Sequence, residues 1–137
     1  MILGHGIDIV DLSRIEAVYK KFSDRFLQKF LTPEELNRKP TDEKKFIAFL
    51  SKHWAVKEAV SKAVGCGLIN GSPLHFNDIV LNYSWSHMPI INMTNSLLNI
   101  TMQMHDLDEN DLKNIVFHVS TSGDSGVVIA SVILEKR

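Results

Sequence analysis

The chain has 137 residues, of which 45% are hydrophobic and 23% are charged. This composition excludes a disordered or fibrous protein, and the length predicts one domain, residues 1–137, that buries its own core. Lys and Arg number 15 against 16 Asp and Glu, for a formal net charge of -1, so no whole-molecule attraction to nucleic acid or an anionic membrane is expected. The single cysteine, Cys66, excludes an internal disulfide and a multi-cysteine metal site.

The first residues carry no basic region, and Asp8 interrupts their apolar run, so we expect no secretion signal. No later apolar run approaches the roughly 20 residues that a membrane helix needs. A lone cysteine suits a reducing compartment, and the expected location is the cytoplasm.

The branched apolar residues of Ile2 to Val10 predict a short buried strand. Alternate residues of a strand share a face, so Gly4, Gly6 and Asp8 point the same way. Two interpretations are open. The glycines leave empty space beside a carboxylate, or they permit close backbone packing while Asp8 caps the end of the strand.

Apolar residues recur at three and four residues from Asp11 to Lys29, which predicts an amphipathic helix that Ser23 and Asp24 can break in two. If the helix is continuous, Arg14, Lys21 and Arg25 share a face. That face is either solvated or a docking patch for an acidic partner.

Thr32, Pro33 and Glu35 are typical of a capped helix start, so a short helix begins there. A long helix follows from about Glu43 to Val64 and is stopped by glycines. On one side of it lie Trp54, Ala55, Glu58 and Lys62, which directs Glu58 toward the interior. A Glu on an apolar face needs a partner or a cation, and the alternative is an ion pair with Lys62 one turn on.

The second half of the chain predicts strands at Phe76 to Trp85 and Pro89 to Met93, a helix at Asn95 to His105, and strands at Ile115 to Ser120 and Val127 to Lys136. A loop from Ser120 to Gly126 separates the last two strands. This order predicts an α+β fold with a largely antiparallel sheet and one long central helix.

The sequence lacks the residues that several familiar motifs require. The acidic run from Asp106 to Asp111 lacks the glycine of a calcium loop, the histidines lack zinc spacing, and no nucleophile elbow surrounds Ser120 or Ser122. Two carboxylates, Asp8 and Glu58, remain with Lys62. These are the parts that a magnesium-assisted phosphate transfer needs.

Two segments carry sequence motifs that are more specific than this set of residue types. Gly6-Ile7-Asp8 near the start and the stretch F-L-x-x-x-x-A-x-K-E-A-x-x-K-A-x-G-x-G from Phe49 to Gly67 resemble the holo-[acyl-carrier-protein] synthase family of 4'-phosphopantetheinyl transferases. The resemblance covers nearly the whole chain in order. It implies the fold of that family and transfer of the 4'-phosphopantetheine arm of coenzyme A to a serine of acyl carrier protein. Adenosine 3',5'-bisphosphate is released, and the reaction supports fatty acid biosynthesis.

The resemblance also implies roles for particular residues. Asp8 and Glu58 would hold Mg²⁺, and Glu58, acting through a metal-bound water, would take the proton of the carrier serine. Lys62 would stabilise the phosphate oxygens or protonate the leaving phosphate. The implied contacts of coenzyme A are His53, Lys62, Pro89 and Ser120, and the implied docking residues for the carrier are Arg14, Lys21, Arg25 and Phe26. The family further implies a homotrimer with active sites between subunits.

Two positions depart from the family pattern: His53 stands where Arg is usual, and Gly123 follows Ser122 where His is usual. Both departures put coenzyme A affinity in question more than the type of reaction, because a neutral imidazole holds phosphate less well than a guanidinium. Two rival functions remain. One is a non-catalytic module that binds the carrier or coenzyme A, and the other is a magnesium-dependent diphosphate hydrolase.

Overall fold

The computed structural model describes residues 1–137, and its elements follow the predicted α+β order. Along the chain they are β1 (Ile2–Asp11), α1 (Leu12–Phe30), α2 (Pro33–Leu36), α3 (Glu43–Val64), the 3-10 turn η1 (Phe76–Asp78), β2 (Val80–Tyr83), β3 (Pro89–Asn92), α4 (Asn95–His105), the 3-10 turn η2 (Leu112–Asn114), β4 (Ile115–Asp124) and β5 (Val127–Lys136).

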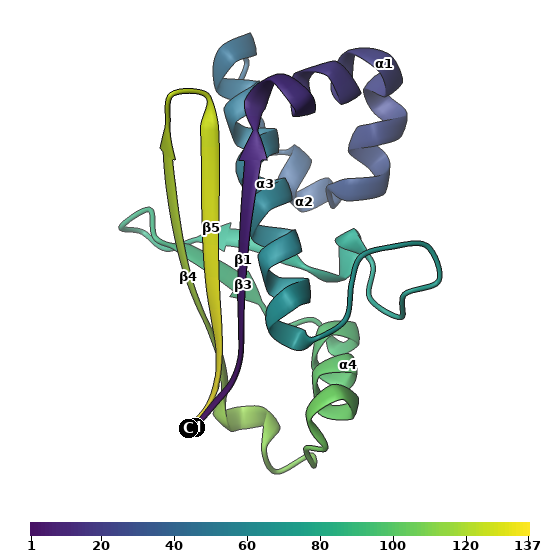
Figure 1. Ribbon diagram of the computed structural model, residues 1–137, viewed down its shortest axis with the longest axis vertical. Helices are drawn as coiled ribbons and strands as arrows, with labels where there is room; N and C mark the ends of the chain where they lie inside the picture. The colour runs from purple at the N-terminus through teal and green to yellow at the C-terminus, as the bar shows by residue number, and fades with distance from the viewer.

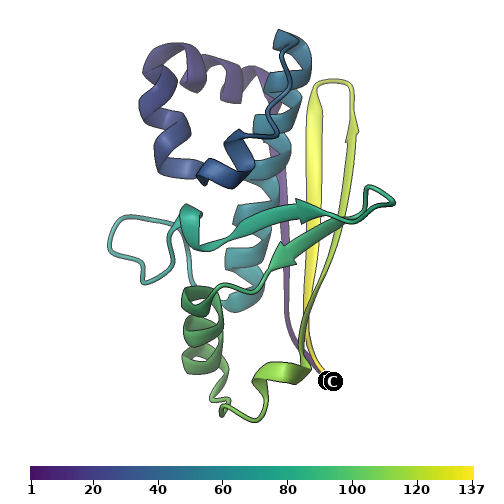
Figure 2. The same ribbon diagram turned by 180° about the vertical axis from the view of Figure 1, so that it is seen from behind.

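All strand pairings are antiparallel, as predicted, but they form two sheets. The larger sheet has the order β1-β5-β4, with β1 at one edge, and α3 lies along one of its faces (Figure 1). On that face Ala130, Val132 and Leu134 are fully buried. The smaller sheet pairs β2 with β3 and crosses α3 on the side that faces the viewer in Figure 2, where its turn extends past β4.

The packing of α3 on β1 is unusually close. A Cβ atom on Gly4 would lie 1.9 Å from the Ala63 carbonyl oxygen, and one on Gly6 would lie 1.9 Å from the Ala59 carbonyl oxygen. No side chain fits there, because real Cβ atoms do not approach backbone so closely. The two glycines therefore serve close backbone packing, which was one of the two interpretations of the sequence.

The caps of the helices explain why the predicted boundaries hold. Asp42 accepts a hydrogen bond from the Lys45 backbone amide at the start of α3, and Gly65 ends the helix in the left-handed conformation with φ 94°. Thr32 and Glu35 form the predicted capping box of α2. The predicted break in α1 is also present, at Ser23, where φ is 43° and ψ is -124°.

Two predicted boundaries were wrong. Strand β2 covers only Val80–Tyr83, because Phe76–Asp78 forms a 3-10 turn that Asp78 stabilises by accepting a hydrogen bond from the His75 amide. Strand β4 extends through the predicted loop as far as Asp124, which pairs with Val127 of β5.

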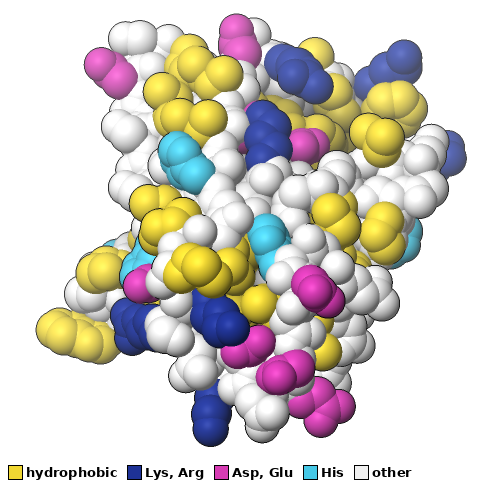
Figure 3. Space-filling model, turned by 60° about the horizontal axis from the view of Figure 1, so that its bottom comes forward, with side chains coloured by type: hydrophobic (Ala, Val, Ile, Leu, Met, Phe, Trp, Pro, Cys, Tyr) yellow, Lys and Arg dark blue, Asp and Glu magenta, His cyan; other side chains and the backbone are white.

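One cluster of 25 buried hydrophobic residues joins both sheets and the helices into a common core. The turn between β2 and β3 lies outside it, with Trp85 96% and Met88 64% exposed. This turn forms the apolar projection at the left of Figure 3, a view in which positive and negative side chains are otherwise intermixed. No helix combines the length and apolar character needed to cross a membrane.

Candidate active site

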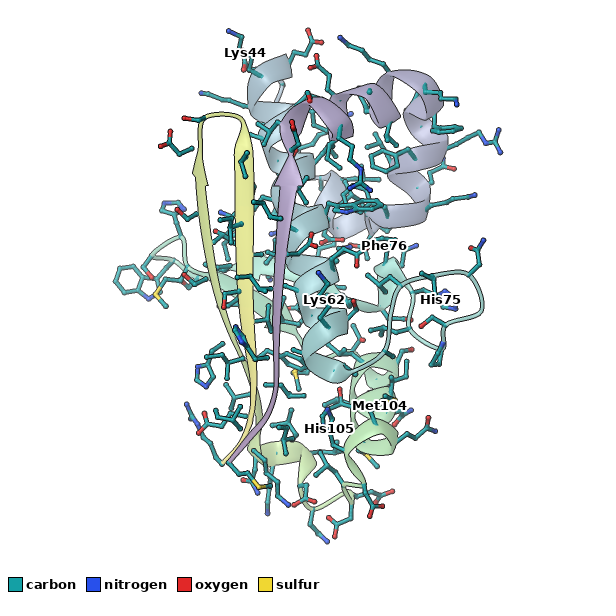
Figure 4. All side chains as sticks on the ribbon, in the orientation of Figure 1. Lys44, Lys62, His75, Phe76, Met104 and His105 are labelled. Carbon is teal, nitrogen blue, oxygen red and sulfur yellow. The ribbon has the colours of Figure 1, made fainter.

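Asp8 lies on the face of β1 that meets α3, and its side chain is 15% exposed. Its Oδ1 atom is 3.1 Å from Nζ of Lys62, which also donates to the Ile7 carbonyl oxygen at 2.9 Å. Lys62 lies between α3 and β1 in Figure 4. The Oδ2 atom of Asp8 is buried and has no hydrogen-bond partner. One oxygen of this carboxylate is therefore available to a ligand.

Glu58 is half-buried on α3, one turn before Lys62. Burial raises the pKa of Glu58, and the charge of Asp8 raises it further, while Lys62 and Arg14 lower it. The sequence allowed an ion pair between Glu58 and Lys62, but Lys62 pairs with Asp8 instead. Two carboxylates thus face a shared space, and only one of them has an ion-pair partner.

These residues fit a divalent cation. Mg²⁺ is commonly bound by one or two carboxylates together with waters and substrate phosphates. Asp8 offers a buried oxygen without a partner, and the pKa of Glu58 is raised by burial and then by the charge of Asp8, both of which a bound cation would offset. No third Asp, Glu, His or Cys completes a protein cage around them, so the remaining ligands would be water and substrate oxygens.

A groove with a cavity of about 550 Å³ opens between the second half of α1 and the segment before η1. Its wall is aromatic: the Trp54 ring lies 5.9 Å from that of Phe26, 5.6 Å from that of Phe30 and 4.8 Å from that of Phe76, centroid to centroid. The lining residues are Val18, Phe22, Arg25, Phe26, Lys29, Phe30, Trp54, Leu68, Ile69, Asn70, Gly71, His75 and Phe76. Figure 4 labels His75 and Phe76 in this region. The groove thus combines apolar surface with basic side chains.

The structure separates the predicted docking residues. Arg25 and Phe26 line the groove, whereas Arg14 lies close enough to Glu58 to lower its pKa. Lys21 lies over the ring of Phe22, with Nζ 5.2 Å from the centroid. The common face was expected only for a continuous helix, and the break at Ser23 lies between Lys21 and Arg25, so Arg25 leaves the helical spacing of Arg14 and Lys21.

His53 does not reach the surface. It is 0% exposed, its Nδ1 lies 2.9 Å from the Phe49 carbonyl oxygen, and burial lowers the pKa of its imidazole to about 4. The predicted contact with a coenzyme A phosphate is therefore wrong for this side chain. The helical spacing placed His53 on α3 correctly, but α2 and β2 cover that side of the helix, as the proximity of Glu35 at 3.6 Å shows.

Pro89 and Ser120 lie on other elements than the carboxylates. Pro89 opens β3 opposite Tyr83. Ser120 is exposed on β4 opposite Ser131, on the face of the sheet that points away from α3. Asp8 points toward α3, so one chain does not bring Ser120 and Asp8 together.

Sequence reasoning missed a buried ion pair next to this site. Glu35 and Lys57 are both 0% exposed, and Nζ of Lys57 lies 2.7 Å from Oε1 of Glu35. The capping pattern identified Glu35, but it gave no sign that a lysine would share the carboxylate. The one available signal was that Lys57 falls between the apolar pairs Ala55-Val56 and Ala59-Val60.

Asp8, Glu58 and Lys62 thus meet where a long helix packs on an edge strand, and these groups suit a divalent cation that could in turn hold an anionic substrate. Residues 4–119 match the sequence model of the 4'-phosphopantetheinyl transferase superfamily, and the chain belongs to this superfamily.

Relatives that match over their full length support the same family. The chain is 33% identical to a holo-[acyl-carrier-protein] synthase of Hydrogenovibrio crunogenus over 100% of this chain and 99% of the relative, and 35% identical to that of Buchnera aphidicola over 98% of each. The crystal structure of the Neisseria meningitidis synthase has a TM-score of 0.80 and 34% identity, covering 99% of this chain and 100% of that one. The Helicobacter pylori synthase in complex with coenzyme A has a TM-score of 0.76 and 31% identity, covering 96% and 99%.

Proposed function

We propose that this protein transfers the 4'-phosphopantetheine arm of coenzyme A to a serine of apo acyl carrier protein and releases adenosine 3',5'-bisphosphate, a step that serves fatty acid biosynthesis. The observation that carries the proposal is the convergence of Asp8, Glu58 and Lys62 at the junction of β1 and α3. The family match and the relatives named holo-[acyl-carrier-protein] synthase support it. The structure of the Helicobacter pylori relative holds coenzyme A, which supports this substrate.

Asp8 and Glu58 would hold Mg²⁺. The metal, when bound, would neutralise negative charge on the diphosphate as its phosphoanhydride bond breaks. The partnerless oxygen of Asp8 and the raised pKa of Glu58 support this assignment.

The protein side chains supply the proton transfer and the fixed charge. The serine oxygen attacks the phosphorus that bears the pantetheine arm, and the anhydride bond to the adenosine phosphate breaks. Glu58, whose pKa burial raises, accepts the serine proton, either directly or through a water. Lys62 is 51% exposed and is anchored by Asp8, so its ammonium stays available to the phosphate oxygens.

The carrier would dock along α1. Arg25 and Lys29 place positive charge at the groove, and Phe26 contributes an apolar wall. Arg14 lies beside the carboxylates, where it would meet the end of the carrier that presents the serine. An acidic amphipathic helix of the carrier matches this combination of charge and apolar surface.

Self-association is part of the proposal. The face of the larger sheet that points away from α3 exposes Ile7, Ile9, Ile129 and Ile133 by 56%, 64%, 38% and 36%. A homotrimer with active sites between subunits would cover this apolar face. It would also let Pro89 and Ser120 of one copy reach a coenzyme A bound by Asp8 and Glu58 of another. We propose a cytoplasmic location, because the lone Cys66 is free and suits a reducing compartment.

One experiment separates transfer from its rivals. Apo acyl carrier protein is incubated with this protein, coenzyme A and Mg²⁺, and the carrier is weighed by mass spectrometry. A carrier that gains the phosphopantetheine arm supports the proposal. Cleavage of coenzyme A without modification of the carrier indicates a diphosphate hydrolase, and binding without either product indicates a non-catalytic module.

A further inference from the structure

The two sides of the aromatic groove come from segments far apart in the sequence, and one ammonium group joins them. Nζ of Lys57 donates to the Phe30 carbonyl oxygen at 2.7 Å, to the Phe76 carbonyl oxygen at 3.1 Å and to Oε1 of Glu35 at 2.7 Å. Phe30 is the last residue of α1 and Phe76 is the first residue of η1. A lysine ammonium has three donors, and all three are used here.

Glu35 is fixed in turn by the elements around it. Its Oε1 atom accepts from the Thr32 backbone amide at 3.0 Å, and its Oε2 atom accepts from the Leu81 backbone amide at 3.0 Å. The pair of Glu35 and Lys57 therefore connects α3 with the end of α1, with α2, with η1 and with β2. Breaking one half of a fully buried pair leaves the other half unpaired, so these connections depend on each other.

Lys57 cannot contact substrate in this arrangement, because its side chain is 0% exposed. Yet the residues whose carbonyl groups it binds, Phe30 and Phe76, are the ones whose rings flank Trp54 in the groove wall. The position of one ammonium thus sets the separation of the two sides of the groove.

We propose that Lys57, held by Glu35, is a positioning residue that keeps the carrier-docking groove open in its binding shape. This inference rests on the proposed function, since the groove is taken to receive the carrier. Asp8 and Lys62 are held by different contacts, namely the glycine packing of β1 on α3 and the Ile7 carbonyl oxygen. A variant can therefore change the shape of the groove without changing the residues proposed to act on the phosphate.

The test uses K57M, which keeps the aliphatic stem and removes the ammonium, and the double variant K57M/E35Q, which also removes the unpaired carboxylate charge. For the double variant we expect the KM for the carrier to rise about tenfold or more, with kcat at saturating carrier and the KM for coenzyme A within about twofold of wild type. Lys57→Arg, which retains the charge, should recover part of the carrier KM. Lys113→Met, an exposed lysine on η2, is the matched control and should change nothing.

A spectroscopic measurement tests the same inference without turnover. The chain has two tryptophans, and Trp85 is 96% exposed, so Trp85→Phe leaves Trp54 as the only indole. In that background K57M/E35Q should shift the emission and the near-ultraviolet circular dichroism of Trp54, and Lys113→Met should not. If K57M alone does not fold, the double variant and Lys57→Arg decide the question.

Three results would overturn the inference. They are an unchanged carrier KM with an unchanged Trp54 spectrum, an equal rise in the KM values for both substrates, and a fall in kcat with both KM values unchanged. If the wild-type protein makes no modified carrier, the proposed function fails, and the Trp54 spectra still show whether Lys57 shapes the groove.

Discussion

Burial raises the pKa of Glu58, and repulsion from the charge of Asp8 raises it further. Glu58→Gln removes this repulsion together with the proposed base and metal ligand. We expect transfer to fall by about a hundredfold or more, with a Tm equal to or above that of wild type. Modified carrier is quantified by mass spectrometry and Tm by circular dichroism.

The control for that change is Glu16→Gln, which alters a partly exposed glutamate paired with Lys20 at 2.9 Å. It should retain full activity. Undiminished transfer by Glu58→Gln, with or without added Mg²⁺, would remove Glu58 from the metal site and from catalysis.

The buried imidazole of His53 makes the free energy of unfolding depend on pH. Burial lowers the pKa of the folded-state imidazole from 6.5 to about 4, so the unfolded chain binds the proton first as pH falls. Stability conferred by the neutral ring is complete above the unfolded pKa and is lost between pH 6.5 and about 4, by about 3 kcal/mol at most. Urea unfolding at neutral and acidic pH measures this loss, which His53→Gln should reduce.

His87→Asn is the control, since His87 is exposed and its positive φ of 61° suits asparagine. If the pH dependence of unfolding is the same for wild type and for His53→Gln, the buried imidazole is not its source. His53→Arg is a further test of this burial. A guanidinium beside the ammonium of Lys57 should lower the free energy of unfolding rather than tighten coenzyme A binding.

Individual residues differed in how far the sequence could place them. Asp8, Glu58 and Lys62 lie on elements that the sequence predicted, so helix and strand spacing gave the face of each element on which they stand. That these two faces meet was implied by the family resemblance. The burial of His53 and the pairing of Lys57 with Glu35 depend on α2 and η1 folding back onto α3. No local pattern encodes that contact.

At the scale of elements, the closeness of β1 and α3 determines whether the site forms. A methyl group on Gly6 would lie 1.9 Å from the Ala59 carbonyl oxygen, so Gly6→Ala must push the helix from the strand. We expect a loss of about 1–3 kcal/mol or more in the free energy of unfolding, as in overpacked cores, together with loss of transfer.

Gly67→Ala is a suitable control, because its Cβ would meet nothing nearer than 3.8 Å. Urea unfolding and the mass assay are compared for both variants. A Gly6→Ala protein with wild-type stability would show that the strand and helix do not pack as described.

The groove on α1 gives a second prediction at this scale. Arg25→Ala should weaken carrier binding by roughly tenfold at low salt and make the remaining affinity less sensitive to salt, while coenzyme A affinity is unchanged. Titration calorimetry with each substrate measures this. Arg14→Ala should affect both substrates, because Arg14 also lies near Glu58.

Lys20→Ala, an exposed change on the same helix, is the matched control. Equal losses of carrier and coenzyme A affinity in Arg25→Ala would place the carrier elsewhere.

The boundaries of an element could be predicted where residues at its ends specify them. Helix α3 has an Asp cap at its start and a left-handed glycine at its end, and both boundaries were predicted from the sequence. Strand β4 lacks such signals, since Ser120 to Gly123 has the composition of a loop and becomes a strand only because β5 supplies a hydrogen-bonded partner. Its extent is thus set by a contact distant from its own sequence.

At the scale of the whole molecule, the uncovered apolar sheet face predicts association. Ile9 is 64% exposed on this face and pairs with Ile129. Ile9→Glu should shift the protein from trimer to monomer in sedimentation and lower transfer, since residues from two copies are proposed to share each coenzyme A. An Ile69→Glu variant, changed at the groove on another side, should remain associated. A wild-type protein that sediments as a monomer would contradict the trimer.

The sheet register has a consequence for the order of folding. Strand β1 is an edge strand whose only neighbour in its sheet is β5, and Asp8 pairs with Ala130. Chain closure over so long a loop is slow and comes late, after the local helices can form. The Asp8 carboxylate, the proposed metal ligand, is therefore positioned only once β5 has docked. Catalytic competence should appear in the last phase of refolding and be the first property lost when β5 detaches, so a protein that has recovered its helices can still be inactive.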